Sequence, residues 1–280
     1  MKAGTQDKQP VRGTLVGVDR AQTQAADLVT VQLQHGQPVT LKQNPTALKG
    51  SNVRVGACAW DGAYVLAAYL DAQPPGTFAG LRCVELGAGM GLVGLVAARL
   101  GAAVYLTDKP AMTVHARVNA AKNRLLAAAT PAAASAVVGG KQPPQLDVVC
   151  PGPGAAAVVG LDWEDAAAAA AAAASMTAQG PIDLVVATDC IYPDPSGTVP
   201  SSSGFMAAVE ALCRSSSSSS SKRTRVLVSF EARSDELRQA LLGAAAAVPR
   251  GCSVQQIDQQ QLPQGFRCSH IELYELKLGE

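Results

Sequence analysis

A glycine-rich turn is the first part of the chain whose residue types and spacing could do chemistry. The apolar run over residues 81–86 is followed by Gly87-Ala-Gly-Met-Gly91 and then by a helical pattern. Glycines let such a backbone turn tightly and approach a ligand, while the free N–H groups at the start of the next helix attract negative charge. We therefore expect a nucleotide or a similar ligand at this turn.

The glycine spacing alone leaves two ligand classes open. Gly89-x-Gly91-x-x-Gly94 satisfies the dinucleotide fingerprint, and Asp108 follows Gly89 by 19 positions, near the ~20 expected for an acid that binds ribose. The turn is compatible with an NAD-dependent dehydrogenase and with an enzyme that uses S-adenosylmethionine. Asp108 could also be an ordinary N-cap of the next helix, and the two roles are compatible.

Glu85 favours the second ligand class. It stands two residues before Gly87, at the carboxyl end of the first core strand, where an acid would face an ammonium rather than a pyrophosphate. S-adenosylmethionine carries an ammonium and a ribose diol and has no pyrophosphate. A glutamate at this position would therefore suit it and would repel a dinucleotide.

The elements that must position these residues are short apolar strands that alternate with helices. Strand–helix alternation predicts an α/β fold with a mostly parallel sheet and right-handed crossovers. After the turn we expect strands over residues 102–107, 182–187, 225–230, 253–257 and 270–276, and helices over 91–100, 110–126, 205–213 and 234–248. Another strand lies either at 146–150 or at 156–161, and we favour the second because it runs directly into Asp162-Trp163.

The chain is predicted to have an N-terminal β-rich extension over residues 1–55 and one core domain over 56–280. Two β-rich stretches on either side of His35-Gly36 indicate a hairpin, and an amphipathic helix that contains Trp60 leads into the core. Low-complexity inserts interrupt the domain near 127–157, 165–180, 193–203 and 215–222. We expect these inserts to be flexible surface segments, although the alanine run in the second could form a helix.

Composition argues against several partners and locations. The chain has 23 Lys and Arg against 22 Asp and Glu, with no long basic run, so nucleic acid is not an expected partner. Seven cysteines without a C-x-x-C pair argue against a disulfide framework and against a metal site, and they suit a reducing compartment. Without a secretory signal or a long apolar run, we expect a soluble, cytoplasmic protein with no membrane partner.

Several motifs together resemble the seven-β-strand protein-lysine methyltransferases that modify non-histone proteins, related to methyltransferase-like 21. The resemblance covers roughly residues 55–276, interrupted by the inserts, and it implies a Rossmann-like, class I methyltransferase fold with helices on both faces of a seven-stranded sheet. It depends on the upstream Trp60 and on the motifs Val84-Glu-Leu-Gly-Ala-Gly-Met-Gly-Leu-Val-Gly94, Leu106-Thr-Asp108, Leu161-Asp-Trp163 and Asp183-Leu-Val-Val-Ala-Thr-Asp-Cys-Ile-Tyr192.

The resemblance implies a role for each matching position in binding S-adenosylmethionine. Gly87, Ala88 and Gly89 would line its methionine part, with Glu85 beneath, and Asp108 would hold the ribose hydroxyls. Trp163 would pack on the adenine beside Asp162, Thr188 would lie at the cofactor edge, and Trp60 would close over the cofactor from the other side.

Asp189 and Tyr192 are the implied catalytic residues at the mouth of the site. Methyl transfer is an in-line displacement from a sulfonium, so the enzyme mainly aligns a neutral amine with the methyl group. A carboxylate such as Asp189 can hold a lysine ammonium, and an aromatic wall such as Tyr192 favours a cation. Glu231 could line the substrate side of the site or pair with Arg233, and the sequence does not choose between these roles.

The leading hypothesis is a protein-lysine N-methyltransferase that acts on an exposed lysine of a soluble protein such as a chaperone, an ATPase or a translation factor. Three alternatives remain open. They are a small-molecule or protein-histidine N-methyltransferase on the same fold, a non-catalytic binding module, and the dehydrogenase. The insert over 193–203 borders the expected substrate mouth and departs from the family pattern, so cofactor residues transfer more safely than the substrate does.

Overall fold

A seven-stranded sheet lies at the centre of the computed structural model, which describes residues 11–12, 20–48, 55–127, 151–191, 201–213 and 223–279. The strand order is β6-β5-β4-β7-β8-β10-β9. The strands are β4 (Arg82–Leu86), β5 (Ala103–Asp108), β6 (Ala155–Gly160), β7 (Leu184–Thr188), β8 (Arg225–Glu231), β9 (Cys252–Gln256) and β10 (Ile271–Leu278). Strands β6, β5, β4, β7 and β8 pair in parallel with one another in this order. Strand β10 is antiparallel to both of its neighbours, β8 and β9. The predicted mostly parallel α/β sheet is confirmed.

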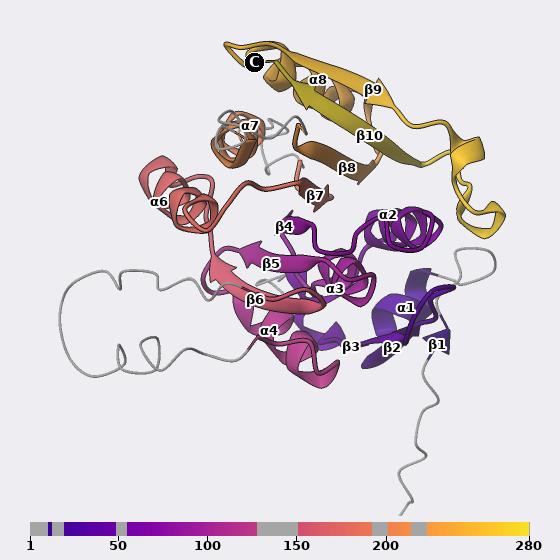
Figure 1. The fold of residues 1–280 in the computed structure, drawn as a ribbon. Helices are drawn as coiled ribbons and strands as arrows, with labels where there is room; N and C mark the ends of the chain where they lie inside the picture. The colour runs from indigo at the N-terminus through magenta and orange to yellow at the C-terminus, as the bar shows by residue number, and fades with distance from the viewer. Residues whose placement is uncertain are drawn as a thin grey trace, which may run out of the picture.

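Helices cover both faces of this sheet (Figure 1). One face carries α2 (Asp61–Asp71), α3 (Leu92–Arg99) and α4 (Thr113–Lys122), and the other carries α6 (Ala166–Thr177), α7 (Ser201–Cys213) and α8 (Asp235–Ala246). Neighbouring strand residues enter opposite cores, because side chains alternate along a strand. Val104 packs with the first set of helices, whereas Tyr105 packs with the second.

The predicted N-terminal hairpin is confirmed as part of a small separate sheet. Strands β2 (Leu28–Val31) and β3 (Val39–Lys42) are antiparallel, and β1 (Val11–Arg12) adds in parallel to β2. The short elements α1 (Arg20–Ala25), η1 (Pro45–Leu48) and η2 (Val55–Ala57) complete this part of the chain.

Two asparagines, Asn119 in α4 and Asn123 directly after it, attach this hairpin to the core domain. Asn123 receives the N–H of Thr40 at 2.9 Å and donates to the Thr40 carbonyl at 2.8 Å. Asn119 receives the N–H of Lys42 at 2.7 Å and donates to the carbonyl of Met90, inside the glycine turn, at 3.0 Å. The side chain of Asn119 therefore links the hairpin to the turn.

The alanine-rich segment after Asp165 is a packed helix and not a flexible surface segment. Asp165 accepts a hydrogen bond from the N–H of Ala168 and so caps the N-terminus of α6. Ala169, Ala172 and Ala173 are buried, because small side chains let this helix approach its neighbours closely. The prediction of a flexible surface segment was wrong for these residues, and the alternative prediction of a helix is confirmed.

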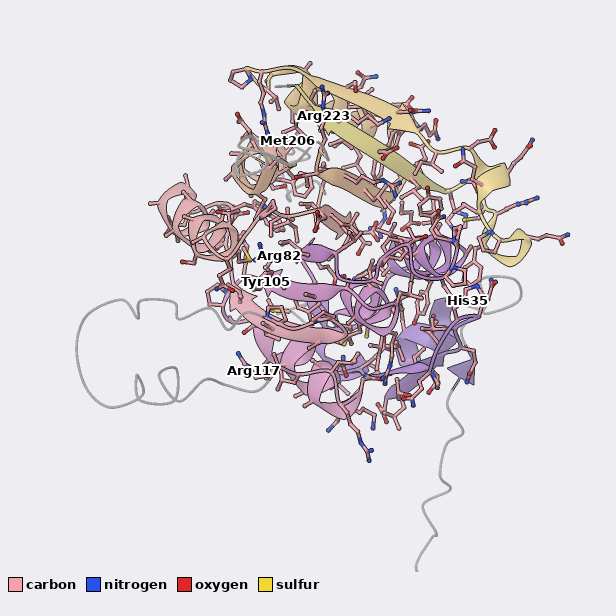
Figure 2. The ribbon with its side chains drawn as sticks, viewed as in Figure 1. His35, Arg82, Tyr105, Arg117, Met206 and Arg223 are labelled. Carbon is pink, nitrogen blue, oxygen red and sulfur yellow. The ribbon has the colours of Figure 1, made fainter. Side chains whose placement is uncertain are left out.

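Arg82 ties the end of this helix to the sheet. Its guanidinium donates to the carbonyl of Met176 at 2.8 Å and to the hydroxyl of the fully buried Tyr105 at 3.0 Å. Figure 2 shows Arg82 and Tyr105 beside each other in the middle of the molecule. The basic side chain thus satisfies polar groups that the packing of α6 buries.

Three helix boundaries differ from the prediction. Helix α4 begins at Thr113 and not at residue 110, because Lys109 and Met112 first close a hydrogen-bonded turn. Helix α2 begins at Asp61, after the extended residue Trp60. Helix α7 begins at Ser201, inside the segment predicted as an insert.

The favoured strand near residue 156 is β6, whereas the alternative at 146–150 lies outside the described residues.

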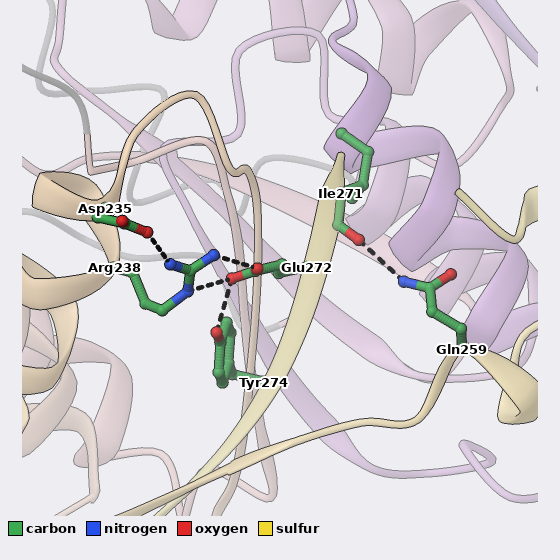
Figure 3. Close-up of polar contacts among 6 residues, drawn as sticks. All are labelled: Asp235, Arg238, Gln259, Ile271, Glu272 and Tyr274. Atoms are coloured by element: carbon green, nitrogen blue, oxygen red, sulfur yellow. Dashed lines mark hydrogen bonds and ion pairs between the residues drawn. The ribbon is translucent and has the colours of Figure 1, made fainter. Parts of the chain in front are cut away.

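A polar network fastens α8 to β10 (Figure 3). The Arg238 guanidinium contacts both oxygens of Glu272, at 3.1 and 2.5 Å, and also pairs with Asp235. The Tyr274 hydroxyl donates to Glu272 at 2.6 Å, and its ring stacks on Phe230. At the first residue of β10, next to Glu272, the carbonyl of Ile271 accepts a hydrogen bond from the side chain of Gln259 in η5 (Gln259–Gln261). These contacts hold β10 in register against β8.

Candidate active site

A cavity of about 550 Å³ opens at the carboxyl ends of β4, β5 and β7. Ligands of open α/β sheets bind in this position, where the connections leave a crevice. Eight of the eleven residues expected to form the site line the cavity: Trp60, Gly87, Ala88, Gly89, Asp108, Trp163, Thr188 and Asp189. The cavity therefore brings most of the predicted site together.

The glycine turn after β4 requires its glycines. Gly87, Gly89 and Gly91 have φ angles of 63°, 49° and 79°, a left-handed region that side chains disfavour. A Cβ on Gly87 would lie 2.5 Å from Cys190 Sγ and 3.2 Å from the Trp163 ring. The turn thus packs directly against two residues that follow other strands.

Asp108, the last residue of β5, supports this turn. One carboxylate oxygen accepts the N–H of Gly89 at 2.7 Å, and the other accepts the N–H of Lys109 at 2.7 Å. Burial raises the pKa of Asp108, while these two hydrogen bonds act in the opposite direction. Asp108 is therefore not the cap of α4, and it presents its carboxylate to the cavity from a fixed position.

Glu85 lies beneath the turn and is absent from the cavity lining. Its side chain is 2% exposed, and it accepts the N–H of Gly94, in the first turn of α3, at 2.9 Å. Burial raises the pKa of Glu85 to about 8, and the hydrogen bond from Gly94 partly opposes that rise. Direct contact between Glu85 and a ligand ammonium stays a prediction, whereas its contact with the start of α3 is a structural finding.

Trp163 forms one wall of the cavity. The indole is packed edge-on against Phe205, with ring centroids 5.9 Å apart, and its Nε1 is buried without an acceptor in the described part of the chain. Asp162 lies outside the lining and 3.9 Å from the ammonium of Lys109, which also pairs with Glu164 at 2.7 Å. Trp163 therefore lines the cavity, whereas its neighbour Asp162 does not. A contact between Asp162 and the cofactor stays a prediction.

Asp189 follows β7 in a left-handed conformation, with φ 52°, which is uncommon for a residue with a side chain. Its N–H donates to the carbonyl of Ser229, and its Oδ1 accepts the N–H of Glu231 at 2.9 Å. Its Oδ2 is buried and has no hydrogen-bond partner among the residues described. Burial raises the pKa of Asp189 to about 6. Tyr192, the other predicted catalytic residue, lies outside the described residues.

Arg233 is a cavity residue whose role the sequence left open. Its guanidinium lies over the Trp60 ring, 5.4 Å from the centroid, and pairs with Glu231 at 2.7 Å. Both Glu231 and Arg233 line the cavity, so the ion pair and the cavity-lining role, taken as alternatives, occur together. Gly56 and Met112 also line the cavity and were missed, because they come from connections that no motif marks.

Comparison with known proteins gives a match in sequence over the first part of this site. Residues 42–138 match a family model described as lysine methyltransferase. The chain is 38% identical over 97 residues to EEF1A lysine methyltransferase 3 of Xenopus tropicalis, which is 35% of this chain and 37% of that relative. It is 53% identical over 55 residues to the protein N-lysine methyltransferase METTL21A of Mus musculus, 20% of this chain and 25% of the relative. The match therefore spans well under half of these curated relatives.

Solved structures match the fold over most of the chain. A Thermus thermophilus 16S rRNA methyltransferase in complex with AdoMet and guanosine aligns with a TM-score of 0.50 and 15% identity, over 90% of this chain and 50% of that chain. A methyltransferase complexed with SAH, SMU.776, aligns with a TM-score of 0.50 and 12% identity, over 91% of this chain and 57% of the other. The predicted resemblance is confirmed: the chain is similar to the lysine methyltransferases over residues 42–138 and has the class I methyltransferase fold.

Proposed function

We propose that this chain is an S-adenosylmethionine-dependent methyltransferase that modifies a lysine side chain of another protein. One observation carries the proposal. The glycine turn and the buried carboxylate of Asp189 line a single cavity, so a cofactor on the turn and an amine at Asp189 would share one space. The match to the lysine methyltransferase model supports the choice of acceptor.

The residues of the cavity fit the proposed cofactor. The glycines of the turn leave room for the methionine part, and the fixed carboxylate of Asp108 can accept hydrogen bonds from ribose hydroxyls. The Trp163 ring offers an apolar surface for the adenine. Its buried N–H has no acceptor among the residues that the structure describes, so a ligand could supply one. When bound, S-adenosylmethionine supplies a methyl group activated by its sulfonium.

The protein would act on the acceptor through position and charge. Asp189 Oδ2 would receive the lysine ammonium, orient its nitrogen, and stay hydrogen-bonded to it while a proton leaves to water. The neutral nitrogen, still aligned by Asp189, would then be the acceptor of the methyl group, and S-adenosylhomocysteine would be the leaving product. With a pKa of about 6, Asp189 is mostly ionised at pH 7 to 8 and can hold a cation there.

The name of one relative suggests where to look for the substrate. A relative is named as a methyltransferase of EEF1A, so a translation elongation factor is the first candidate, followed by chaperones and ATPases. We place the reaction in the cytoplasm, a reducing compartment that suits the free cysteines of the described residues. None of the helices described is long and apolar enough to cross a membrane.

The test is to incubate the protein with a cell lysate and S-adenosylmethionine that carries a labelled methyl group, and to map labelled sites by mass spectrometry. We expect label on lysine, lost in Asp189→Asn and kept in Asp165→Asn, which changes an exposed cap. Label on histidine or only on small molecules would contradict the proposed acceptor. A rise in melting temperature with NAD but not with S-adenosylhomocysteine would contradict the cofactor. Cofactor binding without transfer to any acceptor would indicate a binding module.

A further inference from the structure

We propose that Trp60, Asp189 and Glu231 form a seat for the acceptor ammonium, and that Arg233 occupies this seat until a substrate lysine displaces it. The inference rests on the proposed function and adds a residue that the motifs do not assign. Arg233 is thus an internal competitor of the substrate, and not a permanent part of the cavity wall.

The contacts of Arg233 are those that a bound cation needs. Its guanidinium lies 5.4 Å above the centre of the Trp60 ring and pairs with Glu231 Oε2 at 2.7 Å. A cation above an indole and beside a carboxylate is stabilised by the ring quadrupole and by direct charge attraction. A lysine ammonium could make both contacts in the same place.

A backbone hydrogen bond connects the two acidic residues of the seat. Asp189 Oδ1 accepts the N–H of Glu231, so the two acidic residues are fixed relative to each other. Asp189 Oδ2, in contrast, is buried without a hydrogen-bond partner in the described ranges. An incoming ammonium, with three donors on a compact head, could pair with Glu231 and lie beside the Asp189 carboxylate, since both residues line the cavity.

Arg233 has the freedom to leave that a placeholder requires. Its side chain is 52% exposed, whereas the side chain of Glu231 is only 17% exposed. The residue follows the end of β8, where the described backbone has no regular structure before α8 begins at Asp235. An exposed ion pair of this kind contributes little to stability, so moving the guanidinium into water costs little.

The test compares Arg233→Gln with wild type and with Lys277→Gln, which removes an exposed cation far along β10. With a substrate peptide, we expect Arg233→Gln to lower KM by about threefold to tenfold and to leave kcat within about twofold, since a competitor within the site is removed. The KM of Arg233→Lys should lie between the values of wild type and Arg233→Gln. Lys277→Gln should match wild type. An unchanged or raised KM in Arg233→Gln would overturn the proposal.

A second measurement needs no methyl transfer. Butylammonium at pH 8 serves as the probe, and its binding is followed by isothermal titration calorimetry, which does not depend on Trp60 as a reporter. We expect tighter binding to Arg233→Gln than to wild type, and loss of that binding in the double variant with Trp60→Phe. Equal binding to Arg233→Gln and wild type would contradict the seat. If the probe binds as expected but no acceptor is ever methylated, the seat stands and the proposed function fails.

Discussion

Gly62 and Asp189 meet so closely that a Cβ on Gly62 would lie 2.6 Å from Asp189 Oδ2. Gly62 belongs to the first turn of α2, and its carbonyl accepts the hydroxyl of Ser229 at 2.8 Å. The start of α2 is therefore attached to β8 directly beside the Asp189 carboxylate. The position of this helix and the orientation of Asp189 depend on each other.

Gly62→Ala should reduce methyl transfer by tenfold or more, an order-of-magnitude expectation for a displaced catalytic group. The new methyl group would push the Asp189 carboxylate aside, and the backbone bonds that hold Asp189 leave it little room to adapt. Initial rates and circular dichroism would separate lost function from lost fold. Gly243→Ala is the matched control, because no atom lies within 4 Å of its new Cβ. Full activity in Gly62→Ala would contradict this prediction.

Gly94→Ala should destabilise the domain by about 1–3 kcal/mol, the usual cost of overpacking. A Cβ there would lie 2.3 Å from Leu106 Cδ2 and 2.6 Å from Glu85 Oε2, so α3 would have to move away from the sheet. The exposed Gly243 in α8 gives the opposite expectation, a gain of about 0.5–1 kcal/mol from helix propensity. Urea unfolding of both variants measures the difference, and equal shifts would contradict the packing argument.

Asp108→Asn should weaken binding of S-adenosylhomocysteine by about tenfold, since one charged acceptor is lost at the turn and at the proposed position of the ribose. Asp162→Asn should change affinity by less than about twofold if the cavity lining is a correct guide, because Asp162 lies outside it. Isothermal titration calorimetry gives both constants. A large loss in Asp162→Asn would instead support the role that the family resemblance implies for it.

Asp189→Asn should make the folded state more stable at pH 7. Burial raises the folded-state pKa of Asp189 to about 6, with Glu231 and Asp61 adding to the rise and the Glu231 N–H and Arg233 opposing it. A carboxyl whose pKa is raised on folding contributes stability below its unfolded pKa near 4 and loses it as pH rises through about 6. The gain for Asn should be on the order of 2 kcal/mol above pH 7 and should vanish near pH 4. Denaturant melts across pH 4–8 would show it.

Glu272→Gln should remove part of the acid sensitivity of the fold. The Arg238 guanidinium, followed in effect by the Tyr274 hydroxyl, lowers the pKa of Glu272, although burial opposes this. A lowered folded-state pKa contributes stability above the unfolded value near 4.3, and that stability is lost as pH falls through the folded pKa. Wild type should therefore lose more stability between pH 5 and pH 3 than Glu272→Gln does. Parallel thermal melts at these pH values provide the check.

Much of the core could be predicted from sequence because apolar strands and glycine turns are local signals. The sheet, the hairpin and the turn at Gly87 all follow from short segments of the chain. The position of β10 between β8 and β9 could not be predicted, since strand order depends on pairing between distant segments. The alanine helix α6 was uncertain because composition alone does not reveal what a segment packs against.

The site shows the same division between local and distant information. Asp108 and Trp163 could be placed at the cavity because each follows a recognisable strand. Glu85 was expected to face a ligand, but its partner is the N–H of Gly94, a contact set by how α3 lies on the sheet. The stacking of Arg233 on Trp60 joins residues from distant parts of the chain, and no local pattern encodes it.

The place of β10 also determines when the site can form during synthesis. Glu231 at the end of β8 pairs with Ile271, and β10 is translated after every other strand described here. While the chain is still growing, β8 is an edge strand and the acceptor side has no outer support. The glycine turn and Asp108, in contrast, lie at the ends of the central strands β4 and β5, which are not neighbours of β10 in the described sheet. The end of β8 beside the cavity therefore gains its outer neighbour only after residues 271–278 have been translated.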